Sequence, residues 1–427
     1  MMNAASHAIA LVDCVSFYAS CERVFDASLV RRPVVVLSNN DGCIIARSPE
    51  VKQIPELKMG TPIFRVEHVV DAYDVAVFSS NYALYGDMSM RVMEALAEFT
   101  PEVEIYSIVE AFLGLDARPR QSFLEYGTEI REKVRRWTGI PTSIGISQTK
   151  TLAKVAQRFS KKISTTQGVL DLTDPDAQAR VLEETPVEEV WGVGPAYSKL
   201  LKAAGITTAR KLRDADRRWI RQRMTVVGAR IVEELRGVKC LPLEQCPQAR
   251  KSVTCSRSFG RAVESLEELR EAVNTYISRA AERLRRARLA AGVVTVFLGT
   301  NHFGGDPQYS NAVTFELAQA TDTTGELREW ALKGLEKIFR PGYKFKKAGV
   351  MLNRLTPADQ LSMRLYNDSK FERSRGLMRA LDQINARYGR DTIRLGIAPT
   401  DGSWKTRFSK RSPRYTTCLK EALTVRQ

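Results

Sequence analysis

The first apolar run of the chain, Ala8–Val12, ends directly on an acidic residue, Asp13. Such a run indicates a buried strand, and a lone carboxylate at its end is costly to bury. A second acidic residue, Glu110, interrupts another apolar stretch, residues 107–112. If the two strands are neighbours in one sheet, their carboxylates converge and offer hard oxygen ligands to a divalent cation, the minimum for metal-assisted phosphoryl transfer. The alternative is two unrelated surface or capping acids.

The first 182 residues alternate between strand and helix patterns, which indicates an α/β or α+β domain. The segment Ser38–Gly42 contains Asn-Asp-Gly, which suits the positive φ angles of a tight turn. Further strands are expected at 34–37, 103–109, 111–115 and 143–147, and helices at 87–99, 121–137 and 149–160.

The pattern changes at residue 183 to short helices separated by glycine turns. Trp191–Gly194 and Gly205 have the pattern of a helix-hairpin-helix, in which a glycine turn lets backbone N–H groups approach a phosphate. The alternative is an ordinary helix–helix turn. A linker is expected at 245–251. Beyond it, strands are expected at 253–260, 293–298 and 348–352, a long helix at 266–290, and a basic, less regular segment at 356–427.

Charge is distributed unevenly along the 427 residues, whose formal net charge is +16. Residues 1–200 hold 21 Lys and Arg against 26 Asp and Glu, whereas residues 201–427 hold 44 against 23. The basic second half favours a polyanionic partner, nucleic acid above all. No membrane partner is expected, because no apolar run is long enough to span a bilayer and no basic amphipathic helix with an aromatic face stands out.

The seven cysteines include no CxxC pair, and the chain has only three histidines. A structural zinc site therefore has little support, and free thiols in a reducing cytoplasm are expected. The start of the chain lacks the pattern of a signal peptide, so we expect a cytoplasmic protein.

Basic and aromatic residues follow the predicted strands of the first half. A triphosphate needs several cationic donors, and candidates follow these strands: Arg47, Lys52, Lys154, Lys161 and Lys162. Each of these taken singly is also typical of a solvated surface charge. Phe17 and Tyr18 lie just beyond Asp13, where a ring would stand beside whatever Asp13 binds, although core packing is the expectation for Phe17.

Seven stretches of the chain resemble, in order, the motifs of the UmuC branch of Y-family translesion DNA polymerases, the branch of DNA polymerase V catalytic subunits. They are Asp13–Glu22, Pro33–Ser48, Phe78–Met88, Gly145–Ala156, Val190–Gly194, Cys255–Gly260 and Ser412–Thr417. The resemblance implies an α+β fold with right-hand polymerase architecture. Its parts would be a palm (1–23 and 79–182), fingers (24–78), a thumb with the helix-hairpin-helix (183–245), a little finger (252–355) and a small C-terminal module (356–427).

The resemblance also implies roles for individual residues. Asp13, Glu110 and the backbone carbonyl of Cys14 would be metal ligands for two Mg²⁺. Tyr18 would exclude a ribose 2′-hydroxyl as a steric gate. The incoming nucleotide would also meet the side chains of Arg47, Lys52, Tyr82 and Lys161. Template–primer DNA would contact Gly192, Gly194 and Arg257.

One position departs from this family pattern. The second acidic motif of the family has Asp-Glu where this chain has Val109-Glu110, and Gly114 stands where a further Asp is common. Valine has no donor atom, so one of three carboxylates is missing. Losing a ligand shared by both metals forfeits several kcal/mol of transition-state stabilisation, so we expect a slowdown of roughly a thousandfold or more.

Residues 360–366 look like a sliding-clamp-binding peptide, with Gln360, Met363, Leu365 and Tyr366 at its contact positions, although a surface strand or the start of a helix is the alternative. The C-terminal module is expected to serve a UmuD′ dimer and a RecA filament. The chain is thus identified as a member of a family that inserts nucleotides opposite damaged bases in the SOS response. The alternative is a non-catalytic protein on the same fold that binds DNA, the clamp and UmuD′.

Overall fold

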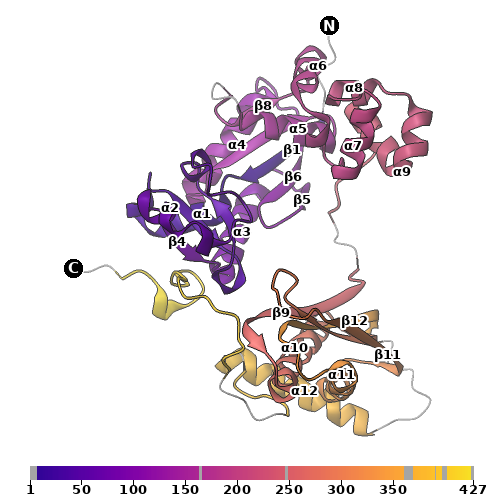
Figure 1. Ribbon diagram of the computed structural model, residues 1–427. Coiled ribbons are helices and arrows are strands. Elements are labelled where there is room, and N and C mark those ends of the chain that lie inside the picture. The colour runs from indigo at the N-terminus through magenta and orange to yellow at the C-terminus, as the bar shows by residue number, and fades with distance from the viewer. Residues whose placement is uncertain are drawn as a thin grey trace. The chain divides into compact units, whose positions relative to one another are not determined.

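The structure, a computed structural model, describes residues 7–162, 166–245, 249–359, 369–389, 391–396 and 402–424. The chain divides into two compact units, Met1–Pro247 with Lys410–Gln427, and Gln248–Ser409 (Figure 1). Among the helices in these ranges, none is long and apolar enough to cross a membrane.

The first unit is built around a five-stranded sheet with strand order β5-β6-β1-β7-β8. Neighbouring strands are antiparallel except for the parallel pair β7–β8. The strands are β1 (His7–Cys14), β5 (Val103–Ile105), β6 (Glu110–Asp116), β7 (Thr142–Ser147) and β8 (Val169–Asp171). Helices α1 (Phe17–Phe25), α3 (Tyr82–Ala97), α4 (Phe123–Thr138) and α5 (Lys150–Ser160) surround this sheet.

The two faces of the sheet follow from the alternation of side chains along β1. Ala8, Ala10 and Val12 belong to the core with α3 and α4. Ile9 and Leu11 belong instead to a cluster that includes Ala153 of α5. Asp13 continues the second series, so its carboxylate lies on the face that carries α5. Helix α5 begins there because the Thr149 side chain accepts a hydrogen bond from the Leu152 N–H.

A smaller three-stranded sheet follows β1 and α1, with strand order β3-β2-β4. It comprises β2 (Val34–Leu37), β3 (Ile44–Arg47) and β4 (Ala76–Ser79), accompanied by α2 (Glu67–Ala72). The predicted turn between β2 and β3 is confirmed, because Asn40 and Asp41 both have positive φ. These elements have an apolar core of their own.

Four helices complete the first unit: α6 (Pro175–Glu184), α7 (Pro195–Ala203), α8 (Ala209–Asp214) and α9 (Arg217–Leu235). They share one apolar cluster with part of α5. Gly205, just past the end of α7, has φ +77°, the left-handed conformation that favours glycine after a helix.

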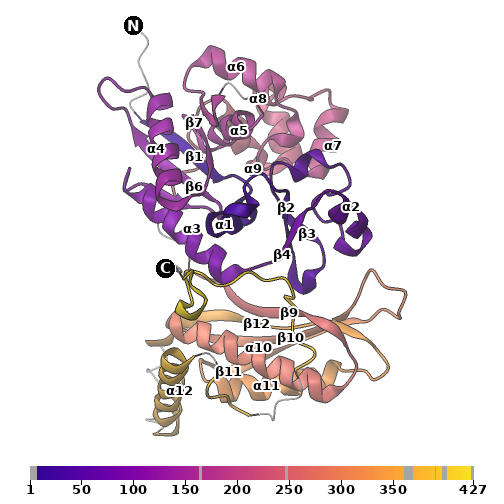
Figure 2. The same cartoon turned by 90° about the vertical axis from the view of Figure 1, so that its left-hand side faces the viewer.

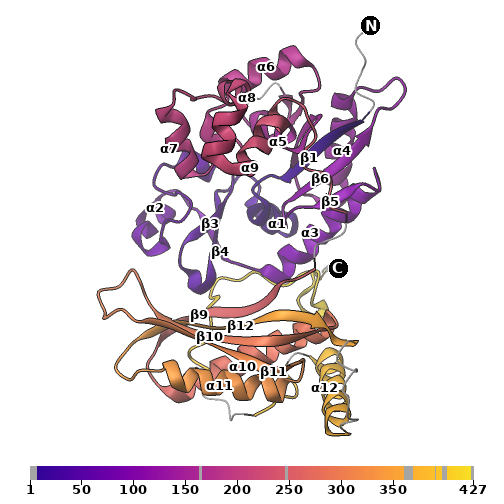
Figure 3. The same ribbon diagram turned by 90° about the vertical axis from the view of Figure 1, so that its right-hand side faces the viewer.

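The second unit contains a four-stranded antiparallel sheet with strand order β11-β10-β12-β9. Its strands are β9 (Ser252–Val263), β10 (Leu289–Thr300), β11 (Ser310–Thr321) and β12 (Phe345–Pro357). Helices α10 (Leu266–Arg286) and α11 (Thr324–Ile338) lie side by side on one face of the sheet (Figure 2 and Figure 3). The Trp404 indole is buried in this unit and donates a hydrogen bond to the Glu271 carboxylate at 2.9 Å.

Three features differ from the sequence-based expectations. Residues 103–109 are not one strand, because β5 ends at Ile105 and a turn precedes β6. The C-terminal segment, expected to be less regular, contains a 20-residue helix, α12 (Ser369–Tyr388). That segment is also divided between the two units instead of forming one module, because Trp404 is anchored in the second unit whereas residues 410–424 pack in the first.

Candidate active site

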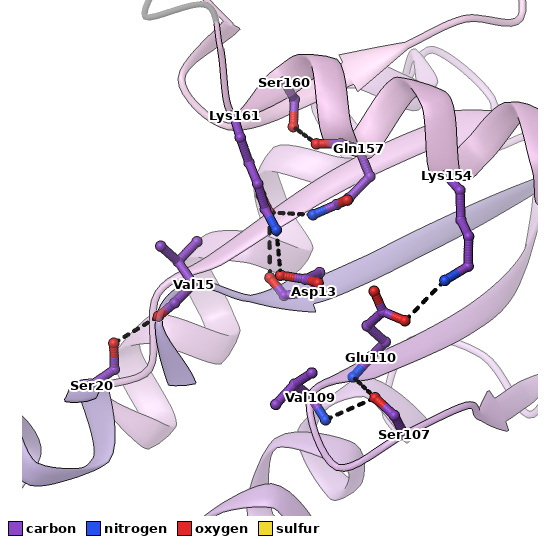
Figure 4. Close-up of polar contacts among 11 residues, drawn as sticks. Asp13, Val15, Ser20, Ser107, Val109, Glu110, Lys154, Gln157, Ser160 and Lys161 are labelled. Atoms are coloured by element: carbon purple, nitrogen blue, oxygen red, sulfur yellow. Dashed lines mark hydrogen bonds and ion pairs between the residues drawn. The ribbon is translucent and has the colours of Figure 1, made fainter. Parts of the chain in front are cut away.

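Asp13 and Glu110 face each other across the two central strands of the large sheet. The antiparallel register of β1 and β6 pairs Asp13 directly with Glu110. Residues paired in this way point to the same face with their Cβ atoms about 4.5–5.5 Å apart. Figure 4 shows the two carboxylates extending into the same space. The predicted convergence of two acids from neighbouring strands is therefore present.

Two lysines of the α5 region pair with these acids. Lys161 Nζ lies 2.7 Å from Asp13 Oδ1, and Lys154 Nζ lies 2.9 Å from Glu110 Oε2 (Figure 4). The two lysines are seven residues apart, which is two helical turns, so both point toward the sheet from one side. Lys154 also lies over the Tyr106 and Trp191 rings, with Nζ 4.3 and 5.2 Å from their centroids.

Burial and a nearby like charge change the acidity of Asp13, which is only 9% exposed. Burial raises the pKa of Asp13 to about 6, the Lys161 ammonium opposes this rise, and Glu110 adds to it. Burial also raises the pKa of the neighbouring Cys14 thiol, so Cys14 remains a protonated thiol at neutral pH. The two acids and the two lysines balance in formal charge, so burial rather than an excess of negative charge is the main cause of the raised pKa of Asp13.

Val109 occupies the turn that leads into β6. The Ser107 hydroxyl accepts hydrogen bonds from the Val109 and Glu110 N–H groups at 3.2 and 3.1 Å, which fixes this turn. The Val109 side chain is half-buried against the core of the large sheet and lies beside Glu110 (Figure 4). Within the described ranges, no three His, Cys, Asp or Glu side chains are grouped as a metal site requires.

A pocket of about 330 Å³ opens at these residues. Asp13, Glu110, Lys154 and Lys161 line one side of it, and residues 188–191, which precede α7, line the other. The Trp191 ring packs against aromatic rings of the large sheet and the turn beside it, with its centroid 6.2 Å from that of Phe112 and 5.8 Å from that of Tyr106. The pocket is polar and open enough to admit a charged ligand.

The predicted triphosphate contacts gather at one edge of the site. Burial lowers the pKa of Lys52, and the nearby Lys161 and Arg47 cations lower it further. Arg47 Nη1 donates to the Leu57 carbonyl at 2.8 Å. Lys161 therefore contacts Asp13, Lys52 lies near both of them, and Arg47 lies near Lys52, an arrangement that suits an anionic ligand with several charges.

Tyr18 of α1 and Tyr82 and Tyr85 of α3 form a wall of three packed rings. The Tyr18 ring stacks on Tyr85, with centroids 4.4 Å apart and planes 15° apart, and meets Tyr82 edge-on at 6.3 Å. Tyr82 is 47% exposed and Tyr85 is fully buried. Phe17 is buried in the core of the large sheet, as expected.

The other predicted site residues lie outside this cluster. Gly192 has φ +88°, and Gly194 is the residue before the first turn of α7. Arg257 lies on β9 in the second unit, near Tyr276 of α10. The predicted clamp contacts are outside the described residues: Gln360, Met363, Leu365 and Tyr366.

Sequence reasoning missed two parts of this site. It grouped Lys154 with the phosphate contacts and missed its pairing with Glu110, although its seven-residue distance from Lys161 places both on one helix face. It also missed Asn81, which is buried and hydrogen-bonds the chain near Ser412, 331 residues away. No local pattern in the sequence indicates such a distant contact.

Comparison with protein families gives matches over most of the chain. Residues 12–158 match the impB/mucB/samB family and residues 250–365 match the C-terminal domain of that family. Residues 375–425 match a domain of unknown function.

Known relatives match over nearly the full length. The chain is 43% identical over 421 residues to Protein UmuC of Salmonella typhimurium, which covers 98% of this chain and 100% of that protein. It is also 43% identical to Protein SamB of the same species, over 96% of this chain and 97% of the relative. DNA polymerase IV of Desulfatibacillum aliphaticivorans is 30% identical over 91% of this chain and 96% of that protein.

A solved structure shares the fold. A Y-family DNA polymerase chimera of Dbh and Dpo4 aligns with a TM-score of 0.65 and 17% identity, over 81% of this chain and 98% of that structure. The α+β right-hand architecture expected from the sequence is therefore confirmed.

Proposed function

Because the chain belongs to the UmuC (impB/mucB/samB) branch of the Y-family DNA polymerases, we propose that Asp13 and Glu110 form its nucleotidyl-transfer site and that Val109 impairs this site. The observation that carries the proposal is the register pair Asp13–Glu110, with cations converging beside it. The reaction would extend a primer opposite damaged template bases during the SOS response.

The donor set fits one divalent cation better than two. Two carboxylates lie on one face of the sheet, and the pKa of one of them, Asp13, is raised to about 6. A bound cation would stabilise their ionised forms. Asp13, Glu110 and the Cys14 carbonyl would hold Mg²⁺, and Val109 leaves the shared ligand position without a donor. Bound Mg²⁺ would neutralise the triphosphate and lower the pKa of the primer 3′-hydroxyl.

The remaining residues have roles that follow from their positions. Lys161 would exchange its contact with Asp13 for the triphosphate, together with Arg47 and Lys52. Tyr18, held between Tyr82 and Tyr85, would meet the sugar and reject a 2′-hydroxyl.

DNA would be held mainly outside this site. The net positive charge of residues 201–427 supports DNA contacts from the second unit, including Arg257. The glycine turn at Gly192 and Gly194 would add contacts from backbone N–H groups to a phosphate. The sliding clamp at 360–366, a UmuD′ dimer and a RecA filament are the proposed protein partners, and the cytoplasm is the proposed location.

A second function is favoured by one observation, Val109 itself. A chain that keeps the fold and the DNA contacts but lacks a metal ligand can occupy primer ends, the clamp or UmuD′ without extending DNA. Both functions use the same surfaces, so only catalysis distinguishes them.

Primer extension across an abasic template tests the proposal. The reactions contain Mg²⁺, UmuD′ and activated RecA, and compare the chain with Val109→Asp. Ile108→Asp is the matched control, because it adds the same charge one residue away in the same turn. We expect only Val109→Asp to extend efficiently. Comparable extension by the unaltered chain refutes impairment, and failure of Val109→Asp refutes the catalytic assignment and favours the binding function.

A further inference from the structure

The C-terminal segment that returns to the first unit is attached to the helices that carry the tyrosine wall. Ser79 N–H donates to the Lys410 carbonyl at 3.0 Å, and Lys410 N–H donates to Ser79 Oγ at 2.9 Å. Farther along, the Tyr415 ring stacks on Phe25 at the end of α1, with centroids 4.6 Å apart. The segment therefore contacts both β4 and α1.

Asn81 is the centre of this attachment and is 1% exposed. Its Nδ2 donates to the carbonyls of Ser412 and Pro413, at 3.0 and 3.1 Å, and to Ser412 Oγ at 3.0 Å. Its Oδ1 accepts from the Leu84 N–H at 3.4 Å, as the N-cap of α3. One side chain thus begins the helix that carries Tyr82 and Tyr85 and also holds the C-terminal segment.

A buried carboxylate links the C-terminal segment to the tyrosine wall. Glu22 of α1 is 2% exposed and has two side-chain donors, the Tyr85 hydroxyl at 2.5 Å and the Ser412 hydroxyl. Burial raises the pKa of Glu22, and the two hydrogen bonds oppose that rise. A buried carboxylate that loses one of its donors leaves an unsatisfied charge or takes up a proton, so both donors matter to its position.

We propose that residues 410–418 are a positioning element of the nucleotide pocket, and that the path Ser412–Glu22–Tyr85 fixes the ring on which Tyr18 stacks. This inference rests on the proposed nucleotide site at Tyr18. It gives the domain of unknown function at 375–425 a specific role in selecting the sugar of the incoming nucleotide. The segment also holds its own shape, because Arg414 forms an ion pair with Glu421 and donates its N–H to that carboxylate at 2.6 Å.

The test is equilibrium binding of a dNTP and of the matching rNTP to the full chain on template–primer DNA with a dideoxy primer end. The readout is the ratio of the two dissociation constants, which does not depend on the fraction of protein that is folded. Tyr18→Ala sets the ratio for complete loss of the steric gate. Thr417→Ala, which removes an exposed hydroxyl in the same segment, is the matched control.

We expect Ser412→Ala to reduce the preference for dNTP about three- to tenfold, toward the Tyr18→Ala value, whereas Ser412→Thr and Thr417→Ala preserve it. Tyr85→Phe, which removes the other donor to Glu22, provides a second variant with the same expected effect. The double variant should be no worse than either single variant, because both act on one path.

Each outcome decides between the explanations. If the unaltered chain prefers dNTP but Ser412→Ala and Tyr85→Phe keep its ratio, the segment is only structural and the inference is wrong. Additive effects of the two substitutions also refute a shared path. If the unaltered chain binds neither nucleotide, the proposed nucleotide site is wrong, and the inference that rests on it is wrong as well. Binding to the unaltered chain alone distinguishes this outcome from the others.

Discussion

The Cys14 N–H donates a hydrogen bond to the Val109 carbonyl at 2.9 Å. The residue that lacks a carboxylate is therefore joined through its main chain to the strand that carries Asp13. This bond does not depend on the side chain at 109. An aspartate at that position would begin from the same backbone, next to Glu110 in the chain.

Val109→Asp should lower stability in the absence of metal. The change places a third carboxylate beside Asp13 and Glu110 and replaces an apolar contact with the core, which together cost about 1–3 kcal/mol. Mg²⁺ should restore more stability to the variant than to the unaltered chain, because a ligand that binds only the folded state raises its stability. Thermal unfolding in EDTA and in saturating Mg²⁺ measures both effects. Equal Mg²⁺ stabilisation of the two proteins would contradict a metal site at this position.

Asp13→Asn should change stability in a pH-dependent way. Asp13 has a pKa near 6 in the folded chain against an ordinary value of 3.8, so the folded state holds a proton that the unfolded state releases between these pH values. The ionised Asp13 carboxylate therefore destabilises the folded state. This destabilisation is absent below pH 4 and fully present above pH 6. The variant should gain up to about 3 kcal/mol relative to the unaltered chain as pH rises across this window. Denaturant unfolding at pH 4 and pH 7 checks it, and a difference independent of pH refutes it.

Lys161→Ala should weaken nucleotide binding. In the proposed site this residue would contribute a charge-assisted contact worth about 1.5–3 kcal/mol, so its loss would weaken binding roughly ten- to hundredfold. Lys162→Ala is the matched control, because its ammonium pairs with Glu189, 2.9 Å away, and not with Asp13. Fluorescent-dNTP binding to the DNA complex measures both variants. A similar loss in the two would show a general charge effect rather than a specific contact.

Two glycines before α7 should respond differently to alanine. A Cβ on Gly192 would lie 2.6 Å from Ile231 Cδ1, at φ +88°, so Gly192→Ala should destabilise the packing of this turn against α9 by about 1–3 kcal/mol. Gly194 has an ordinary φ and open space around its Cα. Gly194→Ala should therefore retain stability and lose DNA affinity, since a methyl group obstructs the approach of a phosphate. Unfolding curves and DNA titrations at two salt concentrations separate these effects. An unchanged DNA affinity of Gly194→Ala would contradict the proposed phosphate contact.

Local patterns were sufficient to predict the elements that support the site. The strand at the apolar run Ala8–Val12, the turn at Asn40 and the helix after Thr149 follow from hydrophobic pattern and turn chemistry. The sequence left open whether the two acids lie on neighbouring strands, and the register of β1 and β6 shows that they do. The valine at 109 was expected in a strand, but the Ser107 hydroxyl instead stabilises a turn there.

The unpredicted features depend on contacts between distant parts of the chain. The pairing of Lys154 with Glu110 requires the crossing of α5 over the sheet, and the pairing of Asn81 with Ser412 joins residues that are 331 positions apart. Helix α12 is amphipathic only in part and lies in a basic segment, so its periodicity was not evident from the sequence. Side-chain pairing of this kind is set by tertiary packing, which local propensity does not encode.

The hydrogen bonds of Asn81 with Ser412 and Pro413 also bear on how the protein is made. A ribosome adds Ser412 331 residues after Asn81, and N-terminal domains generally fold first during synthesis. Until Ser412 has been added, the Asn81 amide and the Glu22 carboxylate lack these partners. A chain truncated before Ser412 would therefore keep the strands that carry Asp13 and Glu110 but leave the surroundings of Tyr85 incomplete.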